Sequence, residues 1–192
     1  KCACAVEAKA QSAARKGLQW HTNYAAAHAE AQRDGRMLLV NFVQDGDSAA
    51  QRQLDAAVEN DQSLQRQLRS MVLVRLPRDY KSESANHNGP LVKHSAFRYL
   101  SGQAGIAIVD LKNVGTPQYG TVVTALPFSP GKYYRWRTNH LKVALGLPPG
   151  TITQRTMIWA VRIHPEAPAS TAGRCDAALS EAAKQHSEYQ AR

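Results

Sequence analysis

The residues best placed for chemistry lie in DGDSAAQ, residues 45–51, between an apolar run and a helical pattern. The N-terminus of a helix favours negative charge, so a nucleophilic side chain is activated there. Ser48 and Gln51 stand three residues apart in this first turn. A serine hydroxyl does not ionise near neutral pH, and glutamine cannot resolve a mixed disulfide. We therefore expect no thiol chemistry at this turn.

The histidines and acids indicate no other reaction centre. None of the seven histidines has the i, i+4 partner of a helical zinc motif, and no carboxylate completes such a set. The sequence has neither a Gly-rich phosphate loop nor Gly-x-Ser-x-Gly, and Asp110 has no partner acid. We expect no metal, no cofactor and no hydrolase site.

The three cysteines, Cys2, Cys4 and Cys175, lie outside the expected core. Cys2 and Cys4 are spaced for a soft metal or a strained disulfide, and the alternative is a terminus with incidental thiols. They leave open a second function, thiol exchange from peripheral segments.

Residues 132–137, KYYRWR, alternate aromatic and basic side chains. Lys132, Arg135, Trp136 and Arg137 form a candidate stacking surface for single-stranded nucleic acid or sugars. The alternative is an amphipathic helix whose apolar side packs on the core.

The charge of the chain is uneven. The net charge is +9, and residues 62–162 hold fourteen Lys or Arg against three acids. A basic region attracts nucleic acid, anionic polymers or acidic proteins, although these charges are dispersed. The hydrophobic fraction is 43%, and no apolar run approaches the ~20 residues of a membrane helix.

Apolar periodicity and turn residues predict alternating strands and helices from Trp20 onward. Asp34-Gly35 ends the first helix, Ser48 caps the second, and Asn60-Asp61 separates it from a third. The predicted strands are 37–43, 71–76, 105–110 and 119–126. The predicted helices are the pattern NYAAAHAEAQRDG up to its stop at Asp34-Gly35, residues 48–58, a stretch marked by Leu64 and Leu68, and residues 91–100 and 132–145. This order predicts an α/β fold with a central mixed sheet.

The strand LLVNF, the loop DGDSAAQRQLD, the spacing of Val58, Leu64 and Leu68 before VLVRL, and the strand GIAIVD together resemble the thioredoxin-like superfamily. The resemblance covers about residues 20–147, and it implies a thioredoxin-like domain of residues 18–147 with the form of a three-layer sandwich. Members of this superfamily usually have Trp-Cys-x-x-Cys at this loop. The resemblance places Asp47 at the position of the tryptophan, and Ser48 and Gln51 at the positions of the two cysteines. The cis-proline position reads Ala104-Gly105, without proline. The resemblance therefore implies a degenerate, non-catalytic site, with these five residues forming a candidate binding loop.

The ends of the chain are expected to differ from this domain. Residues 1–17 read as a flexible Ala-rich leader. Residues 148–192 form a C-terminal extension that weakly resembles the start of a secreted CAP (cysteine-rich secretory protein-like) domain, through Asp176, Leu179, Ala183, His186 and Ser187. The alternative is a helical appendage on the main domain.

We expect a non-catalytic module for protein or peptide interaction, or for structural support, in an exported bacterial protein. The resemblance and a first residue other than Met lead us to expect a periplasmic, secreted or lipid-anchored location. The alternatives are a thiol-redox protein using the peripheral cysteines and a binder of nucleic acid or anionic polymers.

Overall fold

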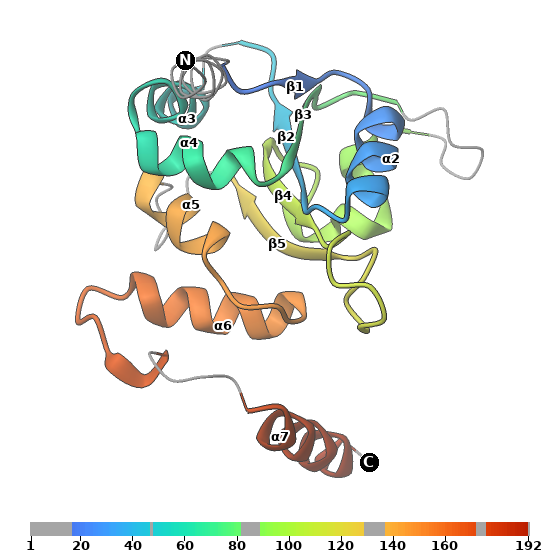
Figure 1. Cartoon of the computed structure of the whole chain (residues 1–192), viewed down its shortest axis with the longest axis vertical. Helices are drawn as coiled ribbons and strands as arrows, with labels where there is room; N and C mark the ends of the chain where they lie inside the picture. The colour runs from blue at the N-terminus through green and yellow to red at the C-terminus, as the bar shows by residue number, and fades with distance from the viewer. Residues whose placement is uncertain (1–16, 47, 82–88, 129–136, 172–175, 192) are drawn as a thin grey trace, which may run out of the picture.

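The computed structural model describes residues 17–46, 48–81, 89–128, 137–171 and 176–191. It is a mixed α/β structure with a central mixed sheet, as the sequence predicts, and the sheet has five strands, one more than the four predicted (Figure 1). The strands are β1 (Trp20–His21), β2 (Leu38–Val43), β3 (Val72–Pro77), β4 (Gly105–Val109) and β5 (Val122–Pro127). Their order across the sheet is β1-β3-β2-β4-β5; β1, β3 and β2 are parallel, and β4 and β5 are antiparallel to their neighbours.

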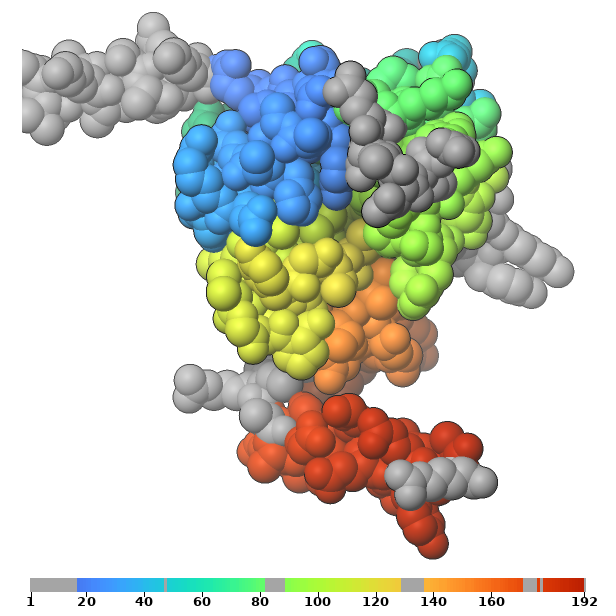
Figure 2. All heavy atoms as spheres, turned by 90° about the vertical axis from the view of Figure 1, so that its right-hand side faces the viewer, coloured from blue at the N-terminus to red at the C-terminus, as the bar shows by residue number. Residues whose placement is uncertain are grey.

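Helices cover both faces of the sheet because the strands are apolar on both sides. Figure 2 views the face covered by α2 (Tyr24–Asp34) and two 3-10 segments, η1 (Leu91–Lys93) and η2 (Ser95–Leu100). The opposite face is covered by α3 (Ala49–Asn60), α4 (Gln62–Arg69), α5 (Thr138–Leu145) and part of α6 (Ile152–Ile163). Alternate residues of β2 feed the two cores: Leu38, Val40 and Phe42 the first, Leu39 the second.

Local signals fix several element ends where the sequence predicts them. The Asn23 side chain accepts from the Ala26 N–H at the start of α2, and Gly35 ends that helix in the left-handed conformation, with φ 60°. The Asp61 side chain accepts from the Leu64 N–H and starts α4. Short polar side chains and a glycine thus set the ends of these helices through contacts with residues that are near in sequence.

Three element predictions need correction. Residues 91–100 form 3-10 turns, not one α-helix, because His94 is extended and its ring accepts from the Ala96 N–H. β5 begins at Val122, since residues 116–121 form turns. The strand predicted at 71–76 is observed as β3, Val72–Pro77, so Pro77 is its last residue and does not lie beyond its end. The predicted helix 132–145 is observed as α5 from Thr138, and residues 132–136 lie outside the described residues.

The region after Leu147 begins with α6, which packs on β5 and α5. Thr151 and Gln154 form a reciprocal capping box at its start. A short 3-10 segment, η3 (Ala169–Thr171), and α7 (Ala177–Gln190) follow; α7 lies at the end of the molecule away from the sheet (Figure 1 and Figure 2). Its described residues are exposed except for Ser180. Among the described helices, none has the length and apolar character needed to cross a membrane.

Candidate functional site

Ser48 and Gln51 are both used in building the start of α3. The Ser48 Oγ accepts from the Gln51 N–H at 3.4 Å and caps the helix. The Gln51 side chain is 9% exposed and turns into the protein. Asp47, the third predicted residue of this loop, lies outside the described residues. The first helical turn therefore presents a cap and a buried amide, and neither is an activated nucleophile.

A chain of polar side chains connects this turn to the sheet. The Asn41 Nδ2 donates to the Gln51 Oε1 at 3.2 Å, and the Gln51 Nε2 donates to the Asp55 Oδ1 at 3.1 Å. Arg75, which pairs with Asn41 across β2 and β3, donates to the same Asp55 oxygen and lies over the Trp20 ring at 4.6 Å. The four polar residues hold α3 against two strands.

Sequence reasoning missed three members of this network: Asn41, Asp55 and Arg75. The available signal was Asn41 itself, one polar residue inside the apolar run LLVNFV. Its side chain is fully buried, and its Oδ1 finds no hydrogen-bond partner among the described residues. A buried polar atom without a hydrogen-bond partner lowers the stability of the fold. The presence of asparagine at position 41 is therefore not explained by packing of the core alone.

The predicted residues Ala104 and Gly105 lie at the same end of the sheet as this turn. Gly105 pairs with Phe42, next to the point where the loop before α3 leaves β2. The described peptide bonds are trans. A Cβ on residue 105 would lie 2.5 Å from the Leu126 carbonyl oxygen, so glycine is needed where β4 approaches β5. Ala104 is buried, and its carbonyl accepts from the Phe128 N–H at 2.8 Å.

The predicted basic and aromatic surface is described only at Arg137, because Lys132, Arg135 and Trp136 lie outside the described residues. Arg137 is exposed at the start of α5. Burial, and then the positive charge of Arg137, lower the pKa of His140. The His140 carbonyl accepts from the Trp159 indole N–H at 3.0 Å. The three cysteines also lie outside the described residues.

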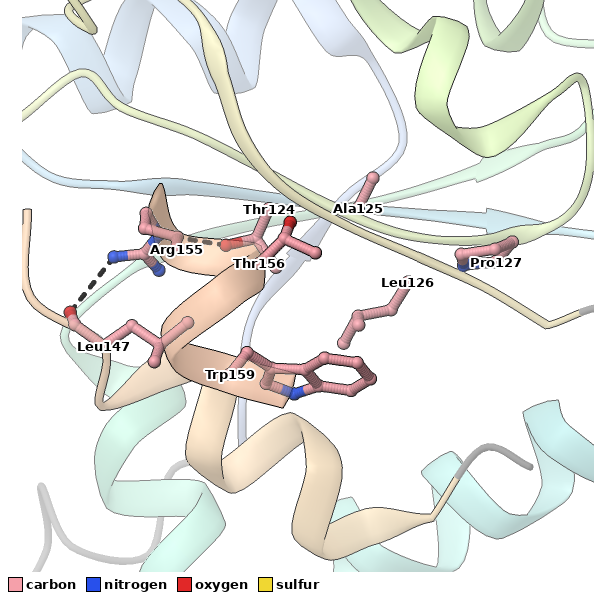
Figure 3. A pocket seen from close by; sticks show the side chains of 8 residues that line it. All are labelled: Thr124, Ala125, Leu126, Pro127, Leu147, Arg155, Thr156 and Trp159. Carbon is pink, nitrogen blue, oxygen red and sulfur yellow. Dashed lines mark hydrogen bonds between the residues drawn. The ribbon is translucent and has the colours of Figure 1, made fainter. Parts of the chain in front are cut away.

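A cavity of about 240 Å³ lies between β5 and α6, where the sequence suggested no site (Figure 3). Its lining is mainly apolar and consists of Thr124, Ala125, Leu126, Pro127, Leu147, Arg155, Thr156 and Trp159. The side chains of Leu126 and Trp159 face each other across it (Figure 3). The cavity follows the outer strand of the sheet for four residues.

Arg155 closes one end of this cavity and is 3% exposed. Its Nε donates to the Val123 carbonyl and the Thr124 Oγ1, each at 3.1 Å. Its Nη atoms donate to the carbonyls of Ala144, Leu147 and Pro148 at 2.7–3.0 Å. Burial lowers the pKa of this guanidinium. The carbonyl end of α5 carries partial negative charge, which favours a cation at this position.

A scan against protein-family models found no match, and neither did searches for similar curated proteins and similar solved structures. The functional argument therefore rests on the geometry of this chain. Among the described residues, no group of three or more His, Cys, Asp or Glu side chains is arranged to hold a metal ion.

Proposed function

We propose that this chain is a non-catalytic, thioredoxin-like module for protein or peptide interaction in an exported bacterial protein. One observation carries the proposal: Ser48 and Gln51, at the positions of the missing cysteines, serve as a helix cap and a buried hydrogen-bond partner. Such side chains stabilise the start of α3 and offer no thiolate for disulfide exchange.

The thioredoxin-like assignment is supported by the order of the elements. Parallel strands alternate with α2, α3 and α4, and then β4 and β5 pair in antiparallel fashion before α5. Apolar clusters on both faces of the sheet support a three-layer arrangement. A fold that positions a loop and an open strand edge can serve binding without catalysis.

The proposal is tested by measuring insulin reduction with the native chain and with a variant in which Cys2, Cys4 and Cys175 are all replaced by Ser. We expect both proteins to match the uncatalysed rate. Turnover by the native chain above that of the triple variant would instead assign the function to the peripheral thiols. Intact mass measurement of the protein from its source cells tests the location, since a lipid anchor on Cys2 adds an acyl-chain increment.

A further inference from the structure

The outer edge of β5 offers main-chain hydrogen-bonding groups. The Phe128 N–H donates to the Ala104 carbonyl, and hydrogen-bonded pairs alternate along an antiparallel ladder. It follows that Ala125 directs its N–H and C=O, and Pro127 its C=O, away from β4. No described segment forms a backbone hydrogen bond to these groups. At the other end of the same edge, the Val123 carbonyl accepts a hydrogen bond from the Arg155 Nε.

A pocket for a side chain lies beside this open half of the edge. Thr124 and Leu126 face the α6 side of the sheet, and both line the cavity. In a strand added to β5, the residues opposite them would point to the same side, because side chains alternate along a strand. The cavity volume of about 240 Å³ is below the ~300–1,000 Å³ typical of small-molecule sites. It therefore suits one side chain rather than a cofactor.

The charge around the edge selects the partner. From residue 111 to residue 165 the sequence contains no Asp or Glu, and this stretch includes all of β5, α5 and α6. Arg137 at the start of α5 and Arg162 on α6 are exposed basic residues of this stretch, whereas Lys142 forms an ion pair with Asp61 at 2.9 Å. Such a surface favours an acidic partner and repels a second copy of the same face.

We propose that the outer edge of β5, between Thr124 and Pro127, binds an extended acidic peptide as an added strand, with one apolar side chain seated between Leu126 and Trp159. The main chain of Ala125 supplies the pairing groups, the cavity selects the apolar residue, and the basic surroundings favour its acidic flanks. This inference rests on the proposed function as an interaction module and names its binding surface.

Selection from a phage-displayed library of random nonapeptides on the full chain provides the probe. We expect enrichment of peptides with several Asp or Glu residues and one large apolar residue. The best peptide, labelled with fluorescein, is then titrated by fluorescence anisotropy. Failure to enrich acidic peptides overturns the proposal.

Two variants and a matched control locate the binding surface. Thr156→Trp fills the cavity from the exposed side of α6, and Ala125→Pro removes the outward N–H from an edge strand, where proline is tolerated. Met157→Trp places the same bulk on the neighbouring exposed residue, outside the cavity. We expect Kd to rise at least tenfold for the first two and to stay within twofold for the control. Circular dichroism confirms that each variant is folded.

Unchanged binding by Thr156→Trp overturns the proposal, as does equal loss in Met157→Trp. Displacement of the peptide by a single-stranded oligonucleotide of equal charge, with no effect of either β5–α6 variant on oligonucleotide binding, also overturns it and assigns the surface to polyanions. These outcomes are independent of the insulin assay. Thiol turnover without loss of peptide binding would reject the non-catalytic function and leave the binding surface intact.

Discussion

Replacing Arg155 by Met should destabilise the protein strongly, even though it removes a buried charge. The substitution keeps much of the aliphatic stem but removes every N–H group with which Arg155 donates to four main-chain carbonyls and the Thr124 hydroxyl. When both partners of a buried ion pair are replaced by apolar groups, the change is often neutral or stabilising. Here the partners are backbone carbonyls, which no substitution removes.

The expected cost follows from three effects. The Ala144 carbonyl still accepts from the Leu147 N–H, whereas no other donor among the described residues reaches the carbonyls of Val123, Leu147 and Pro148. Each buried acceptor left without a donor costs about 1–3 kcal/mol, so these three carbonyls give about 3–9 kcal/mol. Methionine carries no charge, so the variant does not bear the cost of burying a guanidinium, and this offsets several kcal/mol of the loss. Arg155 also lines a second cavity of about 220 Å³, so water can reach some of the carbonyls after the substitution. We expect a net loss of about 3–5 kcal/mol.

Urea unfolding followed by far-UV circular dichroism measures this loss, and the thermal midpoint should fall by about 6–20 °C. Arg162→Met is the matched control, because Arg162 lies on the same helix and its guanidinium is 3.4 Å from the Gly146 carbonyl at the end of α5. Its exposed position predicts a change within about 0.5 kcal/mol. Equal effects of the two substitutions, or a loss below about 1 kcal/mol for Arg155→Met, would refute the reasoning.

Three further results are expected from changes elsewhere. Gly105→Ala should cost about 1–3 kcal/mol in urea unfolding, because the new Cβ meets the Leu126 carbonyl oxygen at 2.5 Å; an unchanged midpoint would show that the two strands can separate there. Ser48→Ala should cost about 0.5–1 kcal/mol, the lower part of the range for caps, since its hydrogen bond to the helix is long at 3.4 Å; Ser63→Ala, on an adjacent helix, is the comparison. Burial lowers the pKa of His28 below its usual value of 6.5, so the unfolded chain takes up a proton more readily; the free energy of unfolding should fall as pH drops through 6.5, and the fall should be smaller in His28→Gln.

Local signals made much of the fold predictable. Asp34-Gly35 ends α2, and Ser48 starts α3, because each residue satisfies a backbone requirement that depends on near neighbours alone. The apolar run of β2 is likewise typical of a strand buried on both faces, and β2 is buried from Leu38 to Phe42. The thioredoxin-like and CAP resemblances stay predictions.

The polar contacts between distant segments were not predictable in this way. Asn41 meets Gln51, and Arg155 meets Val123, only after the sheet and helices have packed. A signal for Arg155 did exist, since it stands on the same side of its helix as Ile152, Ile158 and Trp159, which pack on the cores. A lone charge on an apolar stripe indicates a buried cation whose partners the sequence does not name.

The open half of β5 has a consequence for the behaviour of concentrated solutions. Unpaired strand edges promote aggregation by pairing with the same edge of another copy. Here each copy presents basic residues and no acids on β5 and on the helices α5 and α6 beside it, so two edges repel each other. The Debye length falls from about 10 Å at 0.1 M salt to about 3 Å at 1 M, which weakens that repulsion. Dilute buffers should therefore keep the protein dispersed, whereas concentrated salt should bring its edges together.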